Sequence, residues 1–111
     1  MLYIDIKTSY PKAFKEFETR YKVSLKGDKL YRKNGKELIF YWDYYIEFFE
    51  NYGIMISEKE VNDEFAVYEL VYNEEIISFH ESYIHLNKSE LINDIIIKAF
   101  EILEEKLSQN S

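Results

Sequence analysis

The sequence predicts an α+β domain, in which an antiparallel sheet with two hairpins carries about three helices packed on one side. Apolar residues recur with helical spacing in three separate segments, and turn signals at 34–35 and 73–75 each divide two strand-like segments. The long strand–helix alternation that is typical of a parallel sheet does not occur. With 111 residues, the chain is expected to form one domain over 1–107, followed by a frayed tail at 108–111.

The first third of the chain is predicted to begin with a strand and a helix. Residues 2–7 alternate apolar and polar side chains, as expected of a half-buried strand. Thr8 or Ser9 is a suitable N-cap for the next helix, whose first turn holds Pro11. Apolar residues at helical spacing up to Tyr21 mark the buried side of that helix.

The Asn-Gly pair at 34–35 is the strongest turn signal, because both residue types accept the positive φ of a type I′ turn. Pairing outward from this turn places Arg32 opposite Glu37 and puts the second strand at about 37–41. An ion pair between Arg32 and Glu37 is expected to support this register.

The most apolar segment follows and is predicted to form a helix over about 43–52. Asp43 is a good N-cap, and the glycine at the other end suits the C′ position. At about 100° per residue, Trp42 and Phe49 fall on the apolar face and are expected to be largely buried. Tyr44 is the one aromatic residue that remains on the acidic face.

The C-terminal half is predicted to supply most of the sheet and the last helix. The last helix is expected to begin at Asn87, with Glu90 three residues later as in a capping box. In the segment 54–80, stretches rich in strand-forming residues are separated by stretches rich in turn-forming residues. The expected order is a short strand at 54–57, a charged loop at 58–64, a central strand at 65–72, a turn at 73–75 and a strand at 76–80.

Composition excludes several classes of protein. The chain has no cysteine, so disulfides and thiolate metal sites are excluded. No apolar run approaches the roughly 18–20 residues of a membrane span. The N-terminus also lacks the basic and then apolar segments of a signal peptide. A soluble cytoplasmic protein without a membrane partner is therefore expected.

No catalytic or metal-binding motif is present. His80 and His85 are five residues apart, whereas two ligands on one helical face need a spacing of four. Ser82 between them belongs to no G-x-S-x-G elbow. The three glycines form no phosphate-binding loop. We therefore expect no enzyme activity, no metal and no cofactor.

Charge is distributed unevenly along the chain. Residues 1–36 contain ten Lys or Arg against four Asp or Glu, whereas residues 37–111 contain four against seventeen. This asymmetry indicates either two surfaces of opposite sign or internal neutralisation of the two parts.

The acidic part contains the preferred candidate for a binding surface. Carboxylates with aromatic rings nearby suit a basic protein partner, because charge steers the encounter and the rings anchor the complex. Solubilising charge is the simpler explanation of the same residues. The residues expected to form this surface are Asp43, Tyr44, Glu47, Glu50, Glu58, Glu60, Asp63 and Glu64.

The alternative surface is the basic segment 22–36, which resembles a nucleic-acid-binding hairpin. The net negative charge of the rest of the chain opposes phosphate binding, so nucleic acid is the less favoured partner. The cations of this surface are Lys26, Lys29, Arg32, Lys33 and Lys36.

The last two-thirds of the chain resemble small phage and prophage proteins of unknown function. The resemblance covers about residues 48–107 and implies an origin in a mobile element, with action in the cytoplasm of a bacterial host. Small acidic proteins of such elements often look like inhibitors of host defence nucleases, including anti-CRISPR proteins. The resemblance supplies no catalytic residues. It lies in FFENYGIMIS (48–57), FAVYEL (65–70), the Ser-Tyr pair at 82–83 and IIIKAFEILEEK (95–106).

The expected function is inhibition without catalysis, in which the acidic surface blocks the cationic channel of a basic, nucleic-acid-handling host protein. A toxin-neutralising immunity protein is an alternative with the same surface. A nucleic-acid binder that uses the basic hairpin 22–36 is another, and a housekeeping subunit with merely solubilising charge is a fourth.

Overall fold

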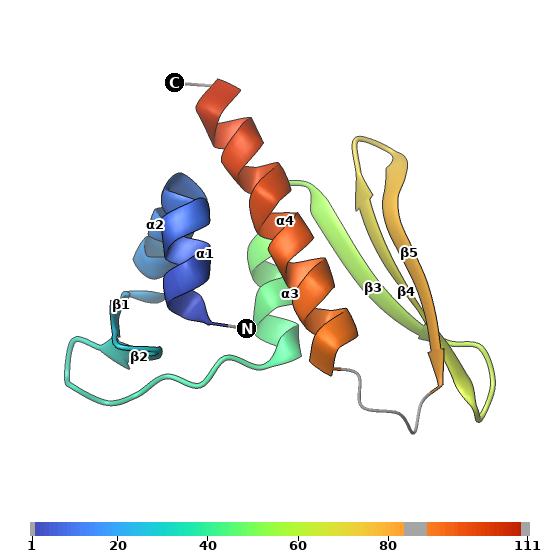
Figure 1. Ribbon diagram of the computed structural model, residues 1–111, viewed down its shortest axis with the longest axis horizontal. Helices are drawn as coiled ribbons and strands as arrows, with labels where there is room; N and C mark the ends of the chain where they lie inside the picture. Colours follow the sequence, from blue (N-terminus) through green and yellow to red (C-terminus); the bar gives the residue numbers. More distant parts are fainter. Residues whose placement is uncertain (1, 84–88, 110–111) are drawn as a thin grey trace.

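The computed structural model of the protein describes residues 2–83 and 89–109. Within these ranges the chain forms four helices and two antiparallel sheets, of two and three strands (Figure 1), which confirms the predicted α+β class. In chain order the elements are α1 (Tyr3–Ser9), α2 (Pro11–Tyr21), β1 (Val23–Lys26), β2 (Lys29–Arg32), α3 (Trp42–Glu50), β3 (Ile54–Glu60), β4 (Phe65–Tyr72), β5 (Glu75–Tyr83) and α4 (Ser89–Gln109).

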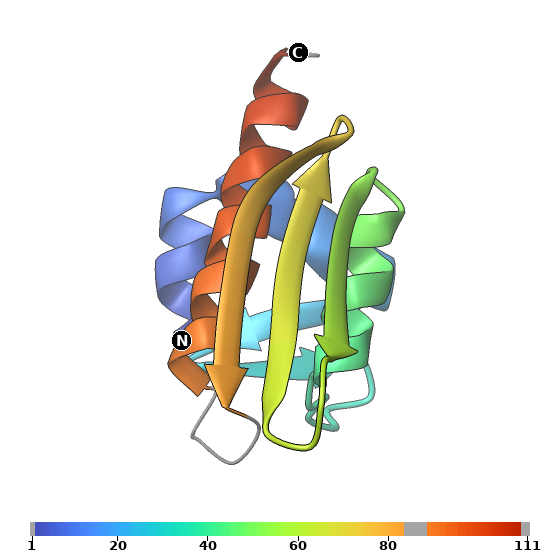
Figure 2. The same ribbon diagram turned by 90° about the vertical axis from the view of Figure 1, so that its right-hand side faces the viewer.

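The elements form three layers, which Figure 1 shows from the side. The sheet β3-β4-β5 is the layer on the right, and α3 and α4 lie along one face of it. Helices α1 and α2 and the β1–β2 hairpin lie on the far side of α3 and α4. Among the described residues, no helix covers the opposite face of the sheet (Figure 2). The helices therefore lie on one side, as the sequence predicts.

Strand β4 is the central strand, as predicted, because β3 and β5 both pair with it in antiparallel register. Its alternate residues Ala66, Tyr68 and Leu70 are fully buried on the side of the helices. Val67 and Glu69 point to the other side and are partly exposed. The period-2 pattern of a sheet that is covered on one face is thus present in β4.

The centre of the molecule is a cluster of phenylalanines from three helices. Phe14, Phe17, Phe48, Phe49 and Phe100 are all fully buried, so the burial predicted for Phe49 is confirmed. The ring centroid of Phe17 lies 5.1 Å from that of Phe48 and 5.8 Å from that of Phe100. Since each aromatic ring removes roughly 150–250 Å² from water, the contacts between helices contribute much of the stability.

Helix α1 occupies residues for which a strand was predicted. Of the alternating apolar residues, only Ile6 is buried, while Leu2 and Ile4 are 51% and 48% exposed. Tyr3, Ile6 and Tyr10 also have helical spacing, and these three pack against the core. The segment fits the period of a strand and that of a helix. The strand prediction was wrong, because among residues 2–83 and 89–109 no strand pairs with this segment.

The predicted caps of α2 are also wrong. The hydroxyl of Thr8 donates to the carbonyl of Ile4 (2.7 Å), and the N-cap position belongs to Tyr10, which makes no side-chain cap. The carboxylate of Glu104 on α4 instead accepts the backbone N–H groups of Lys12 (3.3 Å) and Ala13 (2.8 Å). A residue distant in sequence therefore satisfies donors that the first turn of a helix leaves free.

Glu104→Ala is expected to lower the free energy of unfolding by about 1–2 kcal/mol, because it removes this cap and a negative charge at the positive end of α2. Urea denaturation followed by circular dichroism measures the change. The matched control is Glu105→Ala, which removes the same charge from an exposed neighbour and should change stability by less than about 0.5 kcal/mol. Equal losses in the two variants would mean that the cap contributes nothing.

The β1–β2 hairpin turns at Gly27 and Asp28, and not at the predicted Asn-Gly pair. Lys26 and Lys29 are partners across this turn, and Gly27 has a φ of 64°, which glycine adopts without strain. The carboxylate of Asp28 accepts the backbone N–H of Tyr3 (2.8 Å) and so fixes the turn to the start of α1.

The pair at 34–35 forms a second, wider turn. The N–H of Arg32 donates to the carbonyl of Lys36 (2.8 Å), so the loop has three residues and Gly35 has a φ of 85°. Tyr31 consequently faces Glu37 in an isolated bridge, one position from the predicted register. The predicted cross-strand pairing of Arg32 with Glu37 was therefore wrong.

Residues 37–41 do not continue as a strand, although Leu38 and Phe40 pack against the core while Ile39 and Tyr41 are 59% and 65% exposed. Leu38 keeps one hydrogen bond, from its N–H to the carbonyl of Leu30 (2.8 Å). The ring of Phe40 then packs on Phe17, with 4.4 Å between centroids. This contact is the shortest among the aromatic pairs of the described residues.

Helix α3 begins at Trp42, and Asp43 is not its N-cap. Tyr41 occupies that position, and Asp43 lies in the first turn, where its carboxylate interacts favourably with the positive end of the helix. Gly53 has a φ of 76° but lies two residues beyond the C-cap Asn51, not directly after it. Trp42 is partly buried and packs against the core, in agreement with the prediction that it is largely buried.

Among the remaining elements, the main difference from the prediction is that strands β3 and β5 are longer than expected. Strand β3 continues to Glu60, which shortens the predicted charged loop, and β5 begins one residue earlier and ends three later than predicted. Asn73 and Glu74 have φ values of 54° and 66°, as the predicted turn requires. Helix α4 includes residues 108–109 of the predicted tail, whereas the predicted cap Asn87 and residues 110–111 lie outside the described residues.

Candidate binding surfaces

A cleft of about 470 Å³, here called the acidic cleft, lies between α3 and β3. Its lining combines three carboxylates with three apolar side chains. The lining residues are Trp42, Asp43, Ile46, Ile56, Ser57, Glu58 and Glu60.

The two sides of the acidic cleft follow from the local periods of a helix and a strand. On α3, Trp42 and Ile46 are four residues apart and share a face. On β3, Ile56, Glu58 and Glu60 alternate onto the side of the sheet that faces the helices. The cleft therefore exists because β3 continues past the buried Ile56, so that Glu58 and Glu60 extend the same side of the strand.

Glu58 is held in place by the central strand. Its Oε1 accepts the hydroxyl of the buried Tyr68 (2.9 Å), and the ring of Tyr68 meets that of Trp42 edge to face, with 6.5 Å between centroids. The indole Nε1–H of Trp42 is buried and has no hydrogen-bond acceptor among residues 2–83 and 89–109. An unpaired buried donor lowers the stability of the folded state.

The other residues predicted for the acidic surface lie elsewhere. Tyr44 and Glu47 are on the side of α3 that faces α2, where Glu47 forms an exposed ion pair with Arg20 (3.7 Å). Asp63 and Glu64 are in the β3–β4 loop, and Glu50 is exposed at the end of α3. The structure thus brings together only the carboxylates of Asp43, Glu58 and Glu60.

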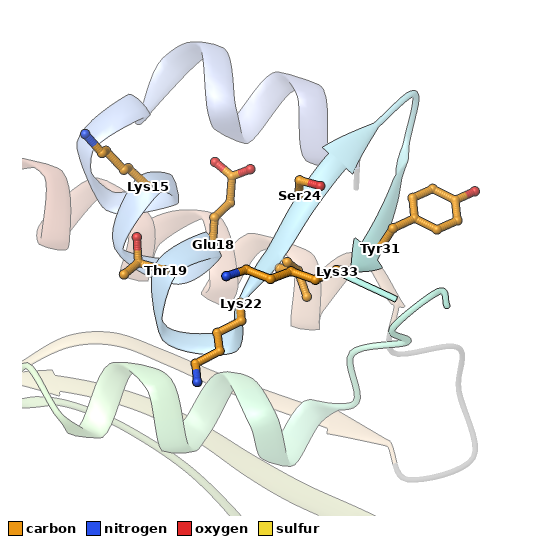
Figure 3. A pocket seen from close by; sticks show the side chains of 8 residues that line it. Lys15, Glu18, Thr19, Lys22, Ser24, Tyr31 and Lys33 are labelled. Carbon is orange, nitrogen blue, oxygen red and sulfur yellow. The ribbon is translucent and has the colours of Figure 1, made fainter. Parts of the chain in front are cut away.

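A second cleft, here called the basic cleft, lies between α2 and the β1–β2 hairpin (Figure 3). It is open to solvent, with a volume of about 600 Å³. Its cations come from the helix, from the helix end and from the segment after β2. The lining residues are Lys15, Glu18, Thr19, Lys22, Val23, Ser24, Tyr31 and Lys33.

Of the predicted basic segment 22–36, Lys22, Tyr31 and Lys33 line this cleft, whereas Lys33 is the one of the five cations singled out from the sequence that does so. Lys26 and Lys29 are paired across the hairpin, on the same side of it as Ser24 and Tyr31. Arg32 alternates to the side that packs on the core, and Lys36 lies beyond the second turn. Sequence analysis missed Lys15, because its position in α2 gives no sign that the hairpin folds back beside it.

Strand β5 contains a hydrogen-bonded Ser–His pair that sequence analysis missed. Ser78 and His80 share one side of the strand, and the Oγ of Ser78 lies 2.8 Å from Nε2 of His80. The bond joins two neighbours on one side of a strand, and such a local contact needs no catalytic explanation. His85, the other candidate, lies outside the described residues.

Neither a metal site nor a membrane span is found in the part of the chain that the structure describes. No three His, Asp or Glu side chains there are placed to hold a metal ion. None of the described helices combines the length and apolar character needed to cross a bilayer.

Comparison of the chain with protein-family models, with curated proteins and with solved structures finds no match.

Proposed function

We propose that this protein is a non-enzymatic binding protein whose acidic cleft receives a cationic segment of a protein partner. The observation that carries the proposal is that Asp43, Glu58 and Glu60 line one cleft together with the ring of Trp42. Carboxylates attract a basic segment and increase its rate of encounter, while a half-buried tryptophan supplies the kind of anchor that dominates binding energy.

Trp42 is suited to contact a Lys or Arg side chain directly. A cation over an indole face gains about 0.5–2 kcal/mol, more when water is excluded.

The finer proposal is that the partner is a basic, nucleic-acid-handling host protein, and that the acidic cleft inhibits it by occupying its cationic channel. The sign of the charge in the acidic cleft supports this choice. An immunity protein that neutralises a basic toxin would use the same surface, and the identity of the partner separates the two roles.

A labelled peptide of alternating arginine and leucine tests the acidic cleft. We expect the triple variant D43N/E58Q/E60Q to bind it about tenfold more weakly than the natural protein at low salt, since each lost charge pair weakens a long-range attraction. Fluorescence anisotropy of the peptide gives the affinity, and emission of Trp42, the single tryptophan, reports contact with the cleft.

The matched control is D63N/E64Q/E74Q, which removes the same charge from the two loops of the sheet. It should change the affinity less than about threefold. Stopped-flow measurements at about 50 and 200 mM salt should show a fall in the association rate and little change in dissociation. Equal weakening by both triple variants would assign the attraction to net charge and refute the acidic cleft as the site.

A further inference from the structure

We propose that the basic cleft binds the phosphodiester backbone of a single-stranded nucleic acid. The site is separate from the acidic cleft, so the proposal does not depend on the function proposed above. It rests on the free cations of the cleft, on its free hydroxyl groups, on its extended shape and on its distance from the acidic part of the molecule.

The three lysines of the basic cleft have no internal partner. The ammonium groups of Lys15, Lys22 and Lys33 take part in no ion pair or hydrogen bond with residues 2–83 or 89–109. The one carboxylate of the cleft, that of Glu18, is engaged by the ammonium of Lys7 (3.5 Å) and by the N–H of Leu25 (3.4 Å). The cleft therefore presents net positive charge in a protein of net charge −7.

Hydroxyl donors accompany the lysines. The side chains of Thr19, Ser24 and Tyr31 line the cleft, and none has a hydrogen-bond partner in the described parts of the chain. Hydroxyls and ammonium groups together are the usual side-chain donors to phosphate oxygens.

The arrangement fits several phosphates in a row better than one. Figure 3 shows Lys33 extending toward α2, while the ammonium groups of Lys15 and Lys22 lie well apart on the helix side. Lys26 and Lys29 continue the positive surface along the hairpin, on the side that also carries Tyr31. One phosphate group cannot contact all of these cations, whereas successive phosphates of a strand can.

A single strand is favoured over a duplex because of Tyr31. Its partly exposed ring lies on the side of the hairpin that carries Lys26 and Lys29 and points away from Lys15, Lys22 and Lys33 (Figure 3). Such a ring stacks with a base that is free of its own neighbours. The bases of a duplex are already stacked and offer no face to this ring.

The structure also weakens the objection raised by the acidic part of the chain. The β1–β2 hairpin and the three-stranded sheet lie toward opposite ends of the longest dimension, which is 42 Å (Figure 1). Residues 54–83 carry one lysine against eight Asp or Glu, so most of the sheet's negative charge is remote from the basic cleft. At physiological ionic strength the Debye length is about 8 Å, and repulsion across the molecule is largely screened.

Anisotropy with labelled oligo(dT) and oligo(rU) tests the proposal. If three phosphates are neutralised, log K falls with log [salt] with a slope of about −2, and affinity drops about 20-fold between 50 and 200 mM salt. The triple variant K15Q/K22Q/K33Q should remove most of the binding and bring the slope toward zero. Tyr31→Ala should weaken binding several-fold, while Tyr31→Phe should retain the stacking contribution.

The matched control K12Q/K59Q/K98Q removes the same charge from lysines that do not line the cleft, and it should bind as the natural protein does. Equal denaturation midpoints of both triple variants check that the fold is intact. Duplex DNA, sodium triphosphate and an oligoglutamate peptide serve as competitors, and each should compete poorly.

The proposal is overturned if the natural protein does not bind either oligonucleotide at about 50 mM salt. It is also overturned if the two triple variants lose affinity equally, or if duplex DNA, triphosphate or oligoglutamate binds as tightly as the single strand. None of these results affects the acidic cleft, whose variants and probe are different.

Discussion

Phe17→Ala is expected to lower the free energy of unfolding by about 3–5 kcal/mol, which is the usual cost of truncating a fully buried phenylalanine. The ring of Phe17 contacts rings from α2, α3, α4 and the segment before α3, so its removal leaves a cavity that no single element can close. Domains of this size have a total stability of about 5–15 kcal/mol, and the variant should be close to unfolding.

Urea denaturation followed by circular dichroism measures the effect. Phe79→Ala is the control, because this residue lies on the uncovered face of the sheet and is 51% exposed. Its truncation should cost well under 1 kcal/mol. Similar losses at both positions would contradict the placement of the core between the helix layers.

Stability is expected to fall steeply above pH 10, because several tyrosines are protonated in the folded state and ionised in the unfolded state. Burial raises the pKa of Tyr45 strongly, and the neighbouring Tyr3 hydroxyl (3.0 Å) raises it further. Burial and a hydrogen bond to Glu16 raise the pKa of Tyr52 to about 12, and burial also raises the pKa of Tyr3 and of Tyr21.

The direction of the change in the free energy of unfolding with pH follows from the number of protons that each state binds. Below the unfolded-state pKa of about 10 both states are protonated, so the stabilisation is fully present. Above it the folded state holds more protons, and each such tyrosine lowers the free energy of unfolding by up to about 1.4 kcal/mol per pH unit. The loss continues until the pH passes the folded-state pKa.

Denaturation midpoints between pH 8 and 12 test this dependence. Tyr45→Phe should reduce the slope above pH 10 by up to about 1.4 kcal/mol per pH unit, while below pH 9 its stability should run parallel to that of the natural protein. An unchanged slope in Tyr45→Phe would show that Tyr45 does not contribute to alkaline unfolding.

Elements whose pattern fits a single period were predictable from the sequence. Strand β4 matches its prediction in both bounds, because it is bracketed by turn residues and has apolar residues on both faces. Helix α2 follows its apolar spacing from Pro11 to Tyr21. Residues 2–7 satisfy the period of a strand and that of a helix, and only the absence of a pairing strand among the described residues decides between them.

The register of the hairpin was not predictable because the two turns compete. Asn34-Gly35 is the stronger local signal, yet the chain reverses first at Gly27 and uses the second turn with three loop residues. The packing of Phe40 on Phe17 opposes the strand that a two-residue turn would require. This contact joins residues from two distant segments and has no local signature.

The sign of the charge on each binding surface was predictable from the sequence, but the set of residues that form each cleft was not. Asp43 was identified with Glu58 and Glu60, but the cleft that they line depends on how α3 packs against β3. The basic cleft depends on the hairpin folding back beside α2, which brings Lys15 near Lys33. Side chains from separate elements form both clefts, and single-sequence periodicity does not report such tertiary placement.

The separation of charge along the longest dimension gives the molecule an electric dipole that is independent of its net charge. Net charge sets whether the protein drifts toward a charged surface, whereas the dipole sets which end arrives first. In the field of a polyanion the molecule turns its hairpin end forward, and in the field of a polycation it turns its sheet end forward. A nucleoprotein presents both fields side by side. At an ionic strength of about 0.01 M, where the Debye length is about 30 Å, the resulting torque would orient the chain across the boundary between strand and protein before any side chain makes contact.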